Sequence, residues 1–230
     1  MNVLTIDIGG TGVKLWHTGH EEHLRFDSGK TLTPDEMIKQ TREIAKEWQY
    51  EAIALGLPCR VSNGRPIEDP QNLGPGWVAY NFSAAFDLPV RVMNDAALQA
   101  LGSYDGGRML FMGLGTAVGS AFIADGLILS LDLGRIQHTK GSLAELFGNK
   151  SLEKLGVKKV QDILHEVVPT LKSSFMADYV VLGGGSAKKF ETLPDGVRRG
   201  HNRTVVEGGR KLWEELSDPA AKKGADWIIL

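Results

Sequence analysis

The sequence is poor in the features that would assign it to a special class of protein. Cys59 is the only cysteine, which excludes an intramolecular disulfide and a cysteine-built zinc site. No apolar run reaches the roughly 18 residues that a membrane-spanning helix needs. The formal net charge of −2 leaves no basic excess of the kind that nucleic acids attract. We therefore expect neither a membrane nor a nucleic acid as a partner.

The composition is that of an ordinary globular protein. The chain has 230 residues, of which 42% are hydrophobic and 23% charged, so it can bury a core as one large domain or as two lobes. The N-terminal stretch lacks the basic and apolar segments of a secretory signal. We expect a cytoplasmic protein.

A glycine-rich stretch near the N-terminus organises the chain. Asp7-Ile8-Gly9-Gly10-Thr11-Gly12-Val13-Lys14 lies between two apolar runs and is typical of a tight hairpin turn. Its backbone N–H groups can form a nest for phosphate oxygens, and Asp7 can hold Mg²⁺ directly or through water. The alternative is that these glycines only make the turn.

Two further glycine turns follow. Gly113-Leu114-Gly115-Thr116 joins the predicted strands 109–113 and 117–124, which repeats the opening pattern and favours a phosphate clamp with two sides. The strand 179–182 then leads through Gly183-Gly184-Gly185 into a predicted short helix. This third turn lets a flat group or another phosphate approach the backbone.

The middle of the chain contains two other candidate segments. The loop 65–80 holds Asn72 and Trp77; it either recognises a sugar or is a surface loop with Trp77 in the core. Asn94-Asp95 follows a predicted strand, 90–93, and begins a helix. A carboxylate at that place is typical of α/β active sites, but Asp95 can also serve only as the helix N-cap.

The remaining elements complete a mixed pattern of strands and helices. A helix is predicted to begin after Thr33, with Pro34 at its first position, and a buried strand is predicted over 52–57. A final helix is predicted over 205–216, and the apolar end 227–230 is either a late strand or disordered.

Together these motifs resemble the superfamily of sugar kinases, actin and Hsp70, and within it the ROK (repressor, open reading frame, kinase) family. The likeness is greatest to short glucokinases of the polyphosphate-glucokinase type. It spans nearly the whole chain and rests on five segments in family order: 7–14, 72–77, 94–95, 113–119 and 183–187.

This resemblance implies an α/β, two-lobed, actin-like ATPase (ribonuclease H-like) fold with a ligand cleft between the lobes. The N-terminal lobe is predicted over 1–110 and the C-terminal lobe over 111–204. The segment 205–230 is predicted to be a helix that crosses back to the first lobe, followed by a tail.

The resemblance also implies a role for each motif. The protein would transfer a phosphoryl group from ATP or polyphosphate to a hexose hydroxyl, with Asp95 as general base. The sugar would contact Asn72, Asn94, Asp95, Asp132 and Arg135. Asp7 would serve the Mg²⁺. The phosphate or nucleotide ligands would be Asp7, Gly9, Gly10, Thr11, Gly12, Lys14, Gly115, Thr116, Gly184 and Gly185.

The chain departs from the family at the sugar site. The family has Glu-x-Gly-His after the second phosphate motif, whereas this chain has Asp132-Leu133-Gly134-Arg135. Arg135 places a fixed cation with five donors there, which predicts either an acidic or phosphorylated sugar or a decayed site. The second function hypothesis is therefore a catalytically weak sugar- or nucleotide-binding protein. Homodimers are common in the family, but no sequence feature identifies an interface.

Overall fold

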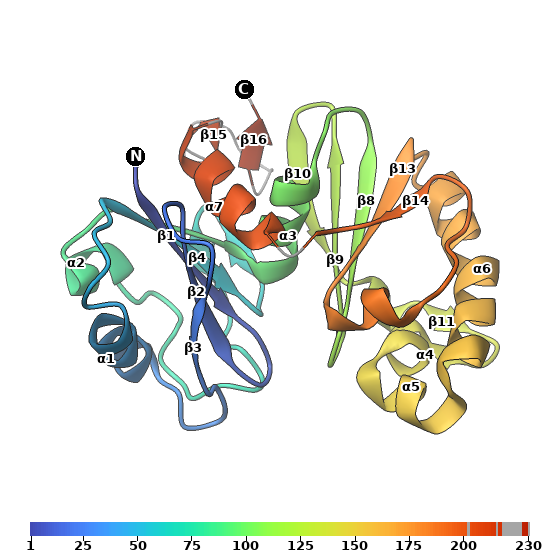
Figure 1. Ribbon diagram of the computed structural model, residues 1–230, viewed down its shortest axis with the longest axis horizontal. Helices are drawn as coiled ribbons and strands as arrows, with labels where there is room; N and C mark the ends of the chain where they lie inside the picture. The colour runs from blue at the N-terminus through green and yellow to red at the C-terminus, as the bar shows by residue number, and fades with distance from the viewer. Residues whose placement is uncertain (202, 215, 218–226, 230) are drawn as a thin grey trace.

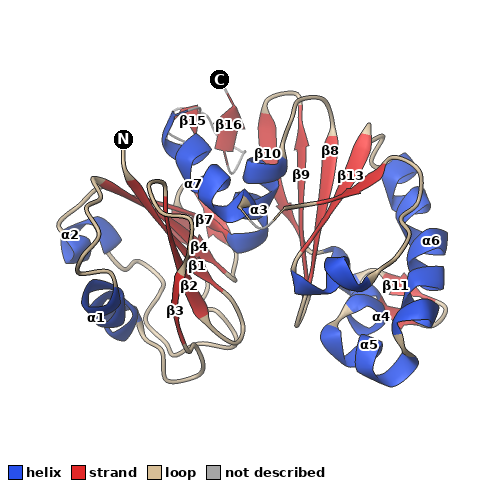
Figure 2. Cartoon of the chain, in the orientation of Figure 1, coloured by secondary structure: helices blue, strands red, loops and turns tan. Residues whose placement is uncertain are grey.

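Two mixed β-sheets face each other across a pair of helices (Figure 1). The computed structural model describes residues 1–201, 203–214, 216–217 and 227–229. The predicted α/β architecture is confirmed (Figure 2). The boundaries proposed for the two lobes remain predictions.

The first sheet has the strand order β3-β2-β1-β4-β7. β1 and β2 form the predicted antiparallel hairpin, and β1, β4 and β7 run parallel. The strands are β1 Val3–Ile8, β2 Val13–His17, β3 Leu24–Phe26, β4 Ala52–Leu57 and β7 Val90–Asn94.

Two helices cover the outer face of this sheet: α1, Pro34–Ile44, and α2, Phe82–Phe86. α1 begins as predicted, because the hydroxyl of Thr33 accepts a hydrogen bond from the N–H of Glu36. Leu4, Ile6 and Ile8 point into the core on this side. Because side chains alternate along a strand, the intervening residues of β1 face the second sheet.

The second sheet has the order β14-β13-β8-β9-β10-β16-β15. β10 was not predicted, and the end of the chain contributes a strand, β16. The strands are β8 Met109–Leu114, β9 Val118–Ala124, β10 Leu127–Leu131, β13 Tyr179–Gly183, β14 Val197–Arg199, β15 Leu216–Ser217 and β16 Trp227–Ile229.

Three helices cover the far face of the second sheet, and two small hairpins lie outside both sheets. The helices are α4 Leu143–Phe147, α5 Asn149–Leu155 and α6 Val157–Ser174, with the 3-10 turns η1 Leu133–Arg135 and η2 Gly185–Lys189. The hairpins pair β5 Val61–Ser62 with β6 Arg65–Pro66 and β11 Gln137–His138 with β12 Gly141–Ser142.

Helices α3, Asp95–Ser103, and α7, Thr204–Glu214, lie between the sheets (Figure 1). They approach each other through glycine: a Cβ at Gly102 would overlap the carbonyl of Thr204, and one at Gly208 would overlap that of Leu98. α7 also contacts β1 and β4 of the first sheet. It ends at Glu214, so the prediction of a helix through Leu216 was wrong: Leu216 pairs with Ile229 instead.

Candidate functional site

Asp7 lies on the face of β1 that looks toward the second sheet. Thr5, two residues earlier on that face, contacts α7 so closely that a Cβ on Gly209 would overlap the hydroxyl of Thr5. In the sheet Asp7 is paired with Lys14 on one side and with Gly56 on the other. The first predicted motif therefore presents a carboxylate and an ammonium group side by side.

Asn94 and Asp95 join β7 to α3. The N-cap is Asn94, not Asp95: the amide oxygen of Asn94 accepts the N–H groups of Ala96 and Ala97 at 3.0 and 3.1 Å. Its amide nitrogen donates to the carbonyl of Cys59 at 3.1 Å and to that of Leu57 at 3.4 Å. These hydrogen bonds fix the start of α3 through Asn94, which also donates a side-chain hydrogen bond to Asp95. The predicted contact of Asn94 with a sugar stays a prediction.

Asp95 is consequently placed beside Asp7. Gly56 makes the approach possible, because a Cβ there would lie 3.4 Å from the Cα of Asp95 and 3.0 Å from Leu98. Burial first, and then the charge of Asp7, raise the pKa of Asp95 to about 7. Burial also raises the pKa of Asp7, against the opposing effects of Lys14 and of a side-chain hydrogen bond from Gln99.

A divalent cation fits this pair of carboxylates. The described residues contain no cluster of three or more His, Cys, Asp or Glu side chains that could hold a metal by themselves. Mg²⁺ usually keeps several waters and takes only one or two protein carboxylates beside substrate phosphates. Two close carboxylates that repel each other match that requirement, and Asp7 is the more enclosed of the two.

The first glycine turn is built as a compact loop. The N–H of Gly9 donates to the carbonyl of Gly12 at 2.9 Å, and Ser28 Oγ donates to the carbonyl of Gly9 at 2.8 Å. Neither Gly10 nor Thr11 donates its N–H to another backbone group among the described residues. None of the turn's glycines has a positive φ. A Cβ on Gly12 would lie 3.3 Å from the carbonyl of Phe26, whereas Cβ atoms on Gly9 and Gly10 would make ordinary contacts.

The first and second glycine turns meet face to face. A Cβ on Gly10 would lie 3.9 Å from the side chain of Thr116, although the two turns join strands of different sheets. In the second turn Gly115 donates its N–H to Ala117, and its Cβ direction is open. The two turns therefore lie close to each other, near the end of β1 that carries Asp7.

The third turn packs against the second. Gly184 has φ +79°, and a Cβ there would overlap the backbone oxygen of Leu114. A Cβ on Gly185 would meet open space, and Gly185 begins η2, a 3-10 helix at the place where a short helix was predicted. Asn149 joins the two turns: its N–H donates to Gly115 at 2.8 Å, and its side-chain oxygen accepts from Ser186 Oγ at 2.6 Å.

The loop 65–80 is held by Asp69, whose carboxylate accepts the N–H groups of Gly76, Trp77 and Val78. These hydrogen bonds keep the pKa of Asp69 below its usual value. Trp77 is fully buried and donates Nε1–H to Gly74 at 2.7 Å. The interpretation in which Trp77 belongs to the core is therefore correct, and stacking of its ring on a sugar is excluded. Asn72 on the same loop is exposed.

Asp132 and Arg135 pair with each other. Arg135 Nε donates to Asp132 Oδ2 at 2.7 Å, and both side chains are exposed. They lie at the two ends of η1, which is next to the second turn because a Cβ on Gly134 would be 3.5 Å from the carbonyl of Val118. The positive charge of Arg135 is thus balanced by the carboxylate of Asp132.

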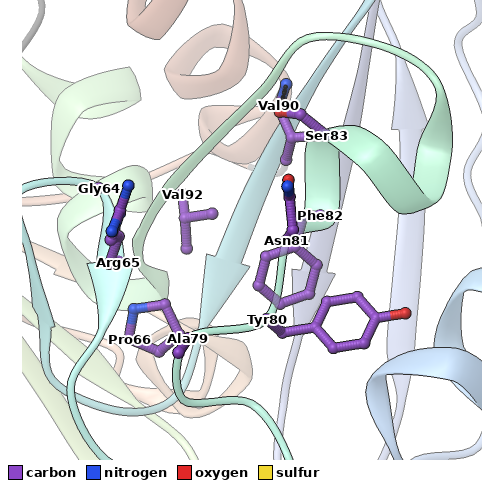
Figure 3. Close-up of a pocket in the computed structure, with 10 residues that line it drawn as sticks. All are labelled: Gly64, Arg65, Pro66, Ala79, Tyr80, Asn81, Phe82, Ser83, Val90 and Val92. Carbon is purple, nitrogen blue, oxygen red and sulfur yellow. Dashed lines mark hydrogen bonds between the residues drawn. The ribbon is translucent and has the colours of Figure 1, made fainter.

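A separate pocket of about 420 Å³ lies at the base of the loop 65–80 (Figure 3). Pro66 and Ala79 line it at the two ends of the loop, and Val90 and Val92 of β7 form another side. Neither Asp7 nor Asp95 lines it. Its polar groups are largely engaged within the protein: Ser83 Oγ accepts the N–H of Val90.

Gln99, Ser28 and Asn149 belong to the site but were not predicted. For Gln99 a signal was present, because residues four apart share a helix face and Gln99 follows Asp95 by four. For Ser28 and Asn149 the sequence holds no comparable signal, since each contact is made across a loop.

Comparison with known proteins finds sugar kinases among the chains that are similar to this one. No protein-family profile matches the chain. N-acetylmannosamine kinase of Salmonella typhimurium is 28% identical over 166 residues, which cover 64% of this chain and 56% of that protein. The chain therefore matches little more than half the length of this curated relative.

Solved structures match over nearly the whole chain. The inorganic polyphosphate/ATP-glucomannokinase of Arthrobacter sp. strain KM superposes with a TM-score of 0.74 and 21% identity, over 90% of this chain and 96% of that one. A ROK-family glucokinase of Streptomyces griseus, solved with glucose and AMPPNP, gives a TM-score of 0.71 and 14% identity, over 92% and 99%. The predicted actin-like kinase fold and the resemblance to ROK sugar kinases are confirmed.

Proposed function

We propose that this chain is a sugar kinase of the ROK type, which transfers a phosphoryl group from ATP or polyphosphate to a hydroxyl of a hexose. The observation that carries the proposal is the meeting of four features in one place. Asp95, with its pKa near 7, adjoins Asp7, and Gly10 of the first turn faces Thr116 of the second, whose side chain would lie 3.9 Å from a Cβ on Gly10.

The chemistry requires little beyond this arrangement. The carboxylate of Asp95 accepts the proton of the sugar hydroxyl while the hydroxyl oxygen bonds to the terminal phosphorus of the donor. The bond from that phosphorus to the bridging oxygen breaks, and the shortened donor leaves with the electron pair. A base whose pKa is near the working pH suits this step, and its contribution is typically about 10²–10⁴ in rate. Positioning and charge stabilisation supply most of the rest.

Asp7 is the residue that we assign to Mg²⁺, directly or through water, with Gln99 holding its carboxylate in place. When bound, the ion neutralises charge on the transferring phosphoryl group. We assign the N–H groups of Gly10, Thr11 and Thr116 to phosphate oxygens, because they donate to no other backbone group within the described part of the chain. Lys14 adds a positive charge beside Asp7.

For the acceptor we favour a neutral hexose over an anionic sugar. Arg135 forms an ion pair with Asp132, so the two side chains together carry no net charge. Such a pair still offers guanidinium donors and carboxylate acceptors to sugar hydroxyls. Glucose, mannose and N-acetylmannosamine are the sugars to compare, because the proteins that this chain resembles are named for kinase activity on such hexoses.

A second function follows from the same pair. If Asp132 and Arg135 remain bonded to each other, the hexose loses two ligands, and the chain would act as a sugar- or nucleotide-binding protein with weak turnover. Asp7, which is buried, and Asp95, which is half-buried, favour the kinase, since a decayed enzyme has no need for two mutually repelling carboxylates.

The deciding experiment is a phosphotransfer assay with Mg²⁺, the three hexoses and either ATP or polyphosphate. We expect sugar phosphate with at least one hexose and one donor, and at least a hundredfold loss in the Asp95→Asn variant. Sugar or nucleotide binding without turnover, measured by calorimetry, would support the binding protein and contradict the kinase.

A further inference from the structure

A row of charged residues crosses the first sheet at the level of Asp7. Asp7 on β1 is paired with Lys14 on β2, and Lys14 is paired with Arg25 on β3. Residues paired in this way project from the same face of a sheet. Lys14 and Arg25 therefore share the face of Asp7, which looks toward the second sheet, and the row runs from Asp7 away from Asp95 toward the edge strand β3.

Arg25 also lies over the first glycine turn. A Cβ on Gly12 would be 4.0 Å from a terminal nitrogen of the Arg25 guanidinium and 3.3 Å from the carbonyl of Phe26. A side chain at position 12 would thus crowd the segment that carries Arg25. The absence of that side chain brings the guanidinium close to the turn whose N–H groups at Gly10 and Thr11 are available.

The row contains two cations, Lys14 and Arg25, and one carboxylate, Asp7. Neither Lys14 nor Arg25 forms an ion pair within the described part of the chain. The field of the two cations reaches His23: burial first, and then Lys14 and Arg25, lower its pKa, whereas Glu22 raises it. Asp7 is the acidic group that faces Lys14.

We propose that Arg25, together with Lys14, binds a phosphate group of the donor next to the one held by the first glycine turn. This proposal rests on the proposed kinase function. A guanidinium can bind a phosphate through two parallel hydrogen bonds, and Lys14 adds a point charge between Arg25 and Asp7. The row gives the non-transferred phosphates a path along β2 and β3.

Two donors could supply the phosphate group that Arg25 and Lys14 bind. The bound group is either the phosphate of ATP that follows the transferred one or a more distant phosphate of a polyphosphate chain. Strands lie about 4.8 Å apart, so Arg25 is roughly 10 Å from Asp7 along the row, which is within reach of a short phosphate chain. The two donors therefore have to be tested separately.

The test compares Arg25→Ala with Arg25→Lys and with the control Lys39→Ala. Lys39 is an exposed cation on α1, on the opposite face of the sheet. We expect Arg25→Ala to raise KM for a donor by roughly tenfold to a hundredfold, the usual range for a lost charged hydrogen bond, with partial rescue by Arg25→Lys and no change in the control. A change with polyphosphate alone assigns the site to distant phosphates, and a change with both donors assigns it to the phosphate that ATP shares.

Unchanged KM values for both donors would overturn the proposal while the kinase function stands. If the wild-type protein shows no turnover, the site is tested by calorimetric titration with tripolyphosphate. Binding weakened tenfold or more by Arg25→Ala supports it, and equal binding by the wild type and Arg25→Ala refutes it.

Discussion

Replacing Asp95 by asparagine should abolish most turnover and at the same time stabilise the fold at neutral pH. The carboxylate is placed beside Asp7, and burial together with that charge raises its pKa to about 7. A raised pKa means that the folded protein binds a proton more tightly than the unfolded chain does. Stability is then present at low pH and is lost as the pH rises from the unfolded pKa of 3.8 through about 7.

The size of the effect follows from that interval. The gap between 3.8 and about 7 corresponds to roughly 4 kcal/mol at about 1.36 kcal/mol per pH unit. Because Asp95 retains partial contact with solvent and its carboxylate accepts hydrogen bonds from the N–H groups of Ala96 and of Asp95 itself, we expect Asp95→Asn to gain about 1–3 kcal/mol at pH 8. At pH 4 the gain should vanish.

The measurement is urea unfolding of the wild type and of Asp95→Asn at pH 4 and pH 8 in the presence of a chelator, since a bound cation would relieve the repulsion. With m near about 3 kcal/mol/M, the midpoint at pH 8 should rise by about 0.3–1 M. Asp162→Asn, an exposed change on α6, is the matched control. An Asp95→Asn protein that is less stable than the wild type at pH 8, or equally shifted at both pH values, would refute this account of the site.

Two further changes test the supporting structure. Asn94→Ala removes the N-cap bonds to Ala96 and Ala97 and should cost about 1–2 kcal/mol in urea unfolding, with a loss of kcat because Asp95 is released; unchanged kcat would contradict its positioning role. Gly184→Ala places a Cβ against Leu114 at φ +79° and should cost about 2–4 kcal/mol. Gly185→Ala, whose Cβ meets open space, is its control, and equal melting temperatures of the two variants would contradict the contact.

The turns and strand ends of this protein could be predicted from the sequence because their signals are local. Glycines between apolar runs produce the hairpin of β1 and β2, and Thr33 with Pro34 marks the start of α1. Asn94-Asp95 after a buried strand locates the start of α3. The roles assigned to these residues in catalysis remain predictions.

What the sequence could not supply are contacts that depend on packing between distant segments. Asn94 serves as the N-cap in place of Asp95, and its amide is held by the carbonyls of Leu57 and Cys59, which lie 37 and 35 residues away. For Trp77 the two interpretations were equal until burial decided between them. From the sequence, Asp132 and Arg135 are two separate candidate ligands. Their ion pair shows that the charge of Arg135 is balanced by Asp132.

The contact between α3 and α7 has a consequence for synthesis on the ribosome. α3 ends at Ser103 and α7 begins at Thr204, so roughly a hundred residues emerge between them, which takes about 5–20 s at usual translation rates. Until then the inner face of the first sheet lacks α7, whose residues Val205 and Val206 cover Trp16. The first sheet is thus synthesised first but receives its last packing element, α7, at the end of synthesis. If translation stalls while the second sheet is being made, the apolar surface around Trp16 stays exposed and becomes a binding site for chaperones.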